Sequence, residues 1–153
     1  MISPCRVAPL LLLATFIGGC RGKPAGEIDK EVTTLGTVEV TAQLVEIPEA
    51  FPPNDLYNYT YVLKYRVLQV HRGDVPKGEI LVAQYNPLKP RSSVQDDLSG
   101  QVGGHVEAFH AGDIHRMALA SPVDLFWMGG IIDKYFKDKG VRYWAVWTNP
   151  GSK

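Results

Sequence analysis

The chain has 153 residues, 21% of them charged, and its formal net charge is zero. This size and composition suit one ordinary globular domain and exclude a disordered or fibrous chain. The balanced charge also argues against a nucleic-acid partner, because domains that bind nucleic acids normally carry a basic excess on one face.

Residues 1–19 have the three parts of a secretory signal peptide. Arg6 supplies positive charge near the amino terminus, an apolar stretch follows over residues 7–17, and the small residues Gly18 and Gly19 end the segment. The apolar stretch is about half of the roughly 20 residues that span a bilayer. We therefore expect residues 1–19 to be a cleaved leader rather than a permanent transmembrane helix.

The end of this leader, Ile17-Gly18-Gly19-Cys20, resembles the lipobox of bacterial lipoproteins, in which an aliphatic and two small residues precede a cysteine. The resemblance implies that Cys20 becomes the first mature residue and carries two or three acyl chains, which anchor a protein stably. The alternative is an ordinary signal peptide with an incidental cysteine. In Gram-negative lipoproteins an Asp after the cysteine favours retention at the inner membrane. Arg21 therefore points to the outer membrane, facing the periplasm.

Residues 20–33 are expected to be the lipidated cysteine and a flexible tether. Residues 21–30 are rich in glycine, proline and charge, and Ile28 is their only large apolar residue. We expect the folded domain over residues 34–150. It holds no cysteine, but a domain of this size can bury about two-thirds of its unfolded surface and fold without disulfides.

Alternation of apolar and polar residues predicts five strands in this domain, over residues 37–47, 57–71, 79–85, 113–120 and 141–148. The first two are long, and each changes phase part-way, at Val45 and at Leu68. Such a change indicates a β-bulge or a sharp coil, the device that bends a strand around a barrel corner. The third strand is apolar at successive positions, so we expect it to be buried on both faces.

The connections are expected to hold one or two short helical segments, near residues 94–98 and 121–127. Residues 131–136 are compatible with either a strand or a helix. Five strands, the first two long and bent, with an irregular segment before the fourth, predict an all-β fold, a small OB-like Greek-key barrel. A two-sheet β-sandwich is the alternative.

The order of the elements resembles the netrin-like, tissue-inhibitor type of OB domain, although the cysteines of that family are absent. The whole domain also resembles members of a group of uncharacterised bacterial lipoproteins. The stretches that carry this second resemblance are FPPNDLY at 51–57, YRV at 65–67, YNPLKP at 85–90, GDIHRM at 112–117 and YWAVW at 143–147. The resemblance implies a location and a fold, and it assigns no activity.

Three histidines, His105, His110 and His115, recur at a spacing of five and are weak candidates for metal ligands. This spacing places neighbours on opposite faces of a strand, so only a folded loop would bring them together. The chain spells out neither a zinc-type ligand pair nor the Gly-x-Ser-x-Gly elbow of serine hydrolases. We therefore expect no metal, no cofactor and no catalytic residue, and keep a His-based metal-binding or hydrolytic protein as an alternative.

Aromatic residues are the stronger candidates for a ligand site. OB barrels bind along one face, often by stacking rings on the ligand. The candidates are Trp127, Trp144, Trp147, Tyr57, Tyr59 and Tyr61. The alternative, which we favour, is that these rings pack in the core.

These observations together predict a non-catalytic binding or assembly module, held at the cell envelope by the lipid on Cys20. Its partners would be the membrane, through the anchor, and an envelope protein or glycan. A second hypothesis, prompted by the aromatic residues, is an accessory domain for the export or modification of surface polysaccharide.

Overall fold

The structure, a computed structural model, describes residues 29–49, 58–94 and 103–153. The predicted leader, the lipidation site Cys20 and the candidate Tyr57 lie outside these residues. No helix within the described ranges combines the length and the apolar character that crossing a bilayer requires.

Strands dominate the described part of the chain. The elements in order are α1 (Lys30–Thr34), β1 (Val38–Glu46), β2 (Thr60–Arg72), β3 (Glu79–Tyr85), η1 (Arg91–Ser93), β4 (Gly103–Gly104), β5 (Ile114–Ala120), η3 (Val123–Leu125), β6 (Ile131–Ile132) and β7 (Arg142–Pro150). The predicted all-β class is confirmed, and each of the five predicted strands is present with its ends shifted by at most a few residues.

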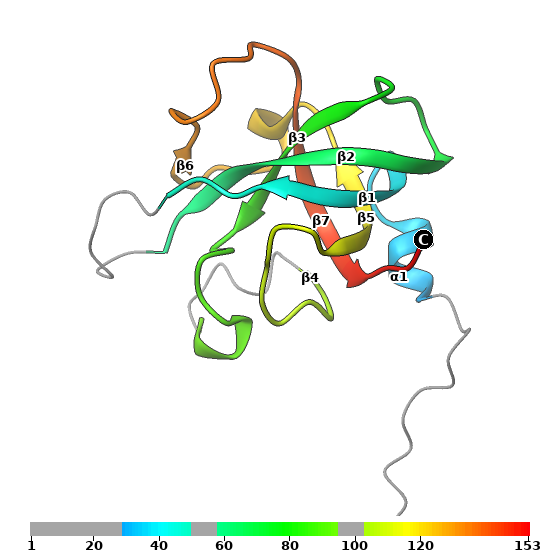
Figure 1. Ribbon diagram of the computed structural model, residues 1–153, viewed down its shortest axis with the longest axis horizontal. Helices are drawn as coiled ribbons and strands as arrows, with labels where there is room; N and C mark the ends of the chain where they lie inside the picture. The colour runs from blue at the N-terminus through cyan, green and yellow to red at the C-terminus, as the bar shows by residue number, and fades with distance from the viewer. Residues whose placement is uncertain (1–28, 50–57, 95–102) are drawn as a thin grey trace, which may run out of the picture.

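Five of these strands form a closed barrel (Figure 1). The sheet runs in the order β1, β5, β7, β3, β2, and β1 also pairs with β2 to close the ring. β3 and β7 are parallel, and the other neighbours in the ring are antiparallel. This is the connectivity of the predicted OB-like Greek-key barrel. The two-sheet sandwich is wrong, because a single sheet closes on itself.

Closure depends on bulges at the two predicted positions. The ladder between β1 and β2 skips Val45 in β1 and Leu68 in β2, and it skips His71 as well. An extra residue bends its strand and increases the local twist. Both predicted bulges are therefore confirmed, and they let two long strands curve around the barrel.

The barrel interior is filled by alternate side chains of all five strands, with Tyr59 partly buried against them. The inward residues of these strands are Val38, Val40, Ala42, Leu44, Tyr61, Leu63, Tyr65, Ile80, Val82, Met117, Leu119, Tyr143 and Ala145. Burial of these apolar side chains is the main driving force for the fold.

A second apolar cluster lies outside the barrel, where residues 121–141 cover the outward side chains of β2, β3 and β7. The members of this outer cluster are Val62, Leu81, Ala83, Tyr85, Val123, Trp127, Phe136 and Trp144. Because side chains of β3 enter both clusters, this strand is buried on both faces, as its composition predicts.

The fold begins before the predicted boundary at residue 34. Lys30–Thr34 form α1, and the side chain of Asp29 caps the helix by accepting a hydrogen bond from the Glu31 amide at 3.3 Å. Val32 is buried. The expectation that the tether extends through residue 33 is therefore wrong for its last residues. A five-residue helix is too short for apolar periodicity to reveal it.

The connections also differ in detail from the expectation. The helix predicted over 121–127 is only the 3-10 turn η3, and residues 131–136 contribute the short strand β6, which pairs in parallel with the start of β2. A 3-10 turn, η1, lies just before the predicted helical segment at 94–98, whose residues 95–98 are outside the described ranges.

The outer cluster predicts different outcomes for substitutions at two neighbouring residues, Trp127 inside it and Met128 outside it. Trp127→Ala should lower the free energy of unfolding by about 3–5 kcal/mol, because it empties the outer cluster. Met128→Ala should change it by no more than about 0.5 kcal/mol, because that side chain is 94% exposed. Urea unfolding of both variants measures the difference, and equal stabilities would contradict the outer cluster.

Candidate functional site

The aromatic candidates lie mostly in the core. Trp127 stacks on Trp144 with ring centroids 4.6 Å apart, and each residue is only 3% exposed. Tyr61 is buried inside the barrel, and Tyr59 packs beside it. The buried rings of Trp127, Trp144 and Tyr61 therefore offer no open face for stacking. The barrel has two apolar clusters, which explains why the aromatic residues exceed what one small core needs.

Trp147 is the exception, because it belongs to neither cluster and is half-buried. Its indole Nε1 donates a hydrogen bond to Asp29 Oδ2 at 3.0 Å. The same carboxylate oxygen accepts from Asn149 Nδ2 at 3.0 Å and lies 3.1 Å from His105 Nε2. This group, which we call the Asp29 cluster, fastens the start of α1 to the end of β7.

Asp29 is suited to this role electrostatically. Hydrogen bonds with Glu31, Asn149 and Trp147 hold the pKa of Asp29 well below its ordinary value, against the opposing effect of burial. The carboxylate is therefore charged at neutral pH. His105 lies edge-on to the Trp147 ring, with centroids 6.1 Å apart, so it borders the same cluster.

The three candidate histidines do not come together. His105 lies beside Asp29, whereas His110 Nδ1 lies 3.4 Å from Asp113 Oδ2 on the surface, and His115 is buried in the barrel. Within the described ranges, no group of three or more His, Cys, Asp or Glu side chains is placed to hold a metal ion.

His115 belongs instead to a buried polar pair inside the barrel. Its Nδ1 lies 2.9 Å from the hydroxyl of Tyr65, and its ring meets Phe109 edge to face with centroids 5.2 Å apart. Burial lowers the pKa of His115 to about 4; Asp113 opposes this effect and Arg91 adds to it. Burial also raises the pKa of Tyr65. Both groups are therefore neutral at physiological pH.

A second polar pair lies in the same interior. Gln84 Nε2 donates to Thr148 Oγ1 at 3.1 Å and lies 3.4 Å from Met117 Sδ. These side chains satisfy each other in a space without access to solvent, which is how buried polar groups avoid a large desolvation cost. Their bonds are internal, and they support the barrel rather than a reaction.

Among the described residues, most of the exposed large apolar side chains lie on the connection between β5 and β7; the other two, Leu68 and Val70, lie on β2. Leu125 is 75% exposed and Met128 94%, and Phe126, Tyr135 and Val141 are exposed as well. Exposed apolar patches of this kind mark interaction sites. The sequence does not reveal them, because they alternate irregularly with the buried Val123, Trp127 and Phe136 and share their apolar character.

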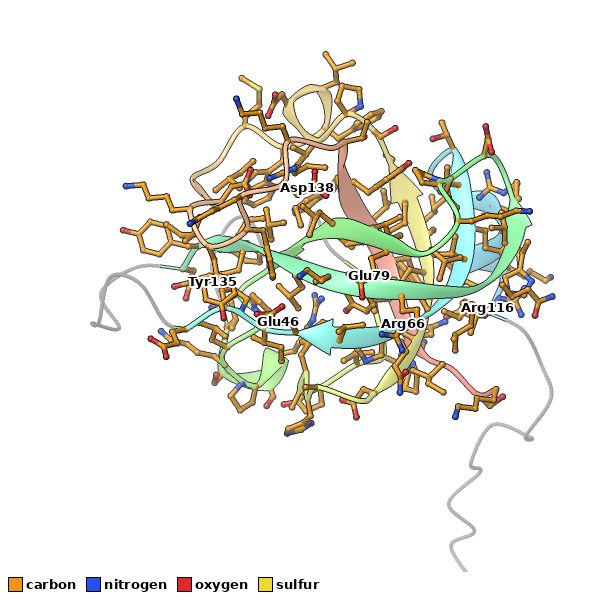
Figure 2. The ribbon with its side chains drawn as sticks, turned by 45° about the horizontal axis from the view of Figure 1, so that its top comes forward. Glu46, Arg66, Glu79, Arg116, Tyr135 and Asp138 are labelled. Atoms are coloured by element: carbon orange, nitrogen blue, oxygen red, sulfur yellow. The ribbon has the colours of Figure 1, made fainter. Side chains whose placement is uncertain are left out.

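Polar contacts hold this connection in place (Figure 2). The Tyr135 hydroxyl hydrogen-bonds to Glu46, which also pairs with Lys64 at 3.1 Å. Arg142 Nε donates to Asp133 Oδ2 at 2.9 Å, and the same guanidinium donates to the backbone oxygen of Asp138. These contacts hold the second half of the connection, and the stacking of Trp127 on Trp144 holds its first half.

The buried histidine predicts acid sensitivity. Because the pKa of His115 is lower in the fold than in the unfolded chain, the unfolded chain takes up the proton first. The free energy of unfolding should fall by about 3 kcal/mol between about pH 6.5 and pH 4. The loss should be smaller in His115→Gln and unchanged in His110→Gln. An imidazole pKa near 6.5, measured by NMR for His115, would contradict this.

The Asp29 cluster predicts a matched pair of carboxylate variants. Asp29→Ala leaves the Trp147 and Asn149 donors without their acceptor, so it should cost about 1–3 kcal/mol and speed hydrogen exchange in α1. Asp124→Ala, at an exposed carboxylate of η3, should stay within about 0.5 kcal/mol of the parent. Urea unfolding and amide exchange at Val32 check both, and unchanged exchange in Asp29→Ala would refute the fastening role.

Comparison with family models, curated proteins and solved structures finds no match for this chain. The roles of its residues are therefore argued from its own geometry. This is a closed OB-like barrel with the Asp29 cluster at the end of β7 and exposed apolar side chains on the connection between β5 and β7.

Proposed function

We propose that the chain is a lipid-anchored protein of the bacterial envelope whose barrel is a non-catalytic binding or assembly module. Cys20 carries the lipid, residues 21–28 link it to the barrel, and the domain faces the periplasm from the outer membrane. The lipobox-like end of the leader supports the anchor, and Arg21 supports the outer membrane.

The observation that carries the binding role is the concentration of exposed apolar side chains on the β5–β7 connection, Met128 above all at 94% exposure. Solvent-exposed Leu, Phe and Met side chains are normally scattered on a monomer, and several on one short segment mark an interaction surface. Met and Phe are also among the residues enriched at protein interfaces.

Binding suits this barrel better than catalysis does. The polar side chains in its interior bond to each other, as in the pairs Tyr65–His115 and Gln84–Thr148. The accessible His105 and His110 lie beside different carboxylates. Of the tryptophans among the aromatic residues that prompted the polysaccharide hypothesis, Trp127 and Trp144 are buried. Trp147 is half-buried, and its indole is bonded to Asp29, so we favour the binding or assembly role.

The anchor is tested in the native host by growth with an alkyne-tagged fatty acid and by mass spectrometry of the mature amino terminus. We expect the label on the parent protein and on Cys5→Ala, because residue 5 is removed with the leader, and no label on Cys20→Ala. A parent protein with an unmodified Cys20 or an intact leader would refute the proposal.

A further inference from the structure

One arginine of the described chain has no partner for its charge. Five arginines lie within the described ranges, and four of them are bonded through the guanidinium. Their partners are Glu79 for Arg66, the backbone oxygens of Leu35 and Gly36 for Arg72, Glu39 for Arg116 and Asp133 for Arg142. Within the same ranges the guanidinium of Arg91 has neither a hydrogen bond nor an ion pair, and its Nε is buried.

Arg91 lies where two connections meet over the barrel core. Its amide donates to the backbone oxygen of Glu107 at 2.8 Å, which joins η1 to the loop between β4 and β5 (Figure 1). Phe109 of that loop is buried against the core, and Cζ of Arg91 lies 5.5 Å from the centre of its ring. The same ring meets His115 edge to face. The charge of Arg91 acts on the buried pair, because it helps to lower the pKa of both His115 and Tyr65.

An unpaired guanidinium is costly in this position. Burial lowers the pKa of Arg91, although Glu107 attracts its charge. The Glu107 carboxylate is itself engaged by Ser92, whose amide donates to Oε1 at 3.1 Å and whose hydroxyl bonds to the same oxygen. A buried charge is stable only when a counter-charge or hydrogen bonds compensate it. The contact with the Phe109 ring compensates for part of this cost.

We infer that Arg91 is the centre of an anion-binding site that takes the carboxylate or phosphate group of a ligand. A guanidinium presents its N–H donors in a planar fork that matches both groups. Arg91 is half-buried, and Nε is the buried one of its nitrogens, so the two Nη atoms are open to an end-on ligand. The inference gives a ligand class to the binding role proposed above, and it rests on that role.

A bound anion has a second effect, inside the barrel. Its negative charge opposes the positive charge of Arg91, which is one of the causes that lower the pKa of His115. The pKa of His115 should therefore rise when the site is occupied. Asp113 is the other charged group that acts on this histidine, and it already favours the protonated ring, whereas Tyr65 is neutral.

The test is an NMR titration of the protein purified from its native host in micelles of a non-ionic detergent. The probes are acetate and inorganic phosphate, compared with sodium chloride at equal ionic strength, and short-chain phosphatidylglycerol, compared with phosphatidylcholine. We expect a saturable shift of the Arg91 Nε–H signal, which burial protects from exchange with solvent, and a rise in the pKa of His115 over the same range. The probe with the lowest midpoint identifies the source as a soluble carboxylate, a soluble phosphate or a lipid.

Matched arginine variants assign the response to one residue. Arg91→Gln should abolish the anion-dependent rise in the pKa of His115. Arg91→Lys should weaken binding about tenfold, because lysine keeps the charge and loses the planar fork. Arg66→Gln removes an exposed arginine that is paired with Glu79, so it should leave the response unchanged. Amide spectra report the fold of each variant, and Arg91→Lys decides the outcome if Arg91→Gln does not fold.

Two carboxylates of the chain itself are the competing partners. Asp96 and Asp97 follow Arg91 in the sequence and lie outside the described ranges. The double variant Asp96→Asn and Asp97→Asn should leave the anion response unchanged. A response that appears only in this double variant, a response that chloride matches, one that survives Arg91→Gln, or none at all would each overturn the inference.

The same preparation separates the inference from the proposed function. The mass of the mature amino terminus reports acylation of Cys20 independently of anion binding. A chain that is not acylated but still binds an anion refutes the anchor alone. An acylated chain without the anion response refutes the Arg91 site alone.

Discussion

The fold depends on one strand pairing with two partners. β1 bonds along one edge to β5 and along the other to β2. Because β5 and β2 are also connected through β7 and β3, the sheet has to curve back on itself. The skipped residues Val45 and Leu68 supply that curvature. Without them, β1 and β2 would continue as a flatter pair, and the inward side chains of β3 and β7 would lose the opposite wall of their core.

The outer cluster follows from this closed shape. A small barrel leaves apolar side chains of β3 and β7 on its outside, and residues 121–141 cover them with Trp127 and Phe136. Because Trp127 and Phe136 point inward onto these strands, the residues next to them in sequence point outward. The exposure of Phe126 and Met128 is therefore a consequence of how Trp127 docks on Trp144. The connection stabilises the barrel with one set of side chains and presents another set to solvent.

The strands and both bulges are predictable from the sequence because alternation is a local signal, and a change of phase is visible within a single strand. The outer cluster cannot be predicted from the sequence in the same way. Trp127 and Met128 are adjacent and both apolar, and only the docking of one of them on a distant strand decides which is buried. The Asp29 cluster is harder still to predict from the sequence, because Asp29 and Trp147 are 118 residues apart. For the candidate tryptophans and for His115, the spacing of residues in the sequence does not predict whether the side chain is buried or what it contacts.

The bulge at Leu68 has a consequence for how copies of the chain coexist. Beyond the pair Arg66–Glu79, β2 no longer has β3 beside it, and among the described strands only β1 accompanies its last residues. A straight strand with Leu68 and Val70 exposed would be a template for edge-to-edge aggregation. Two skipped residues within this stretch twist its backbone, and a twisted edge is a poor template for the strand of a neighbouring molecule.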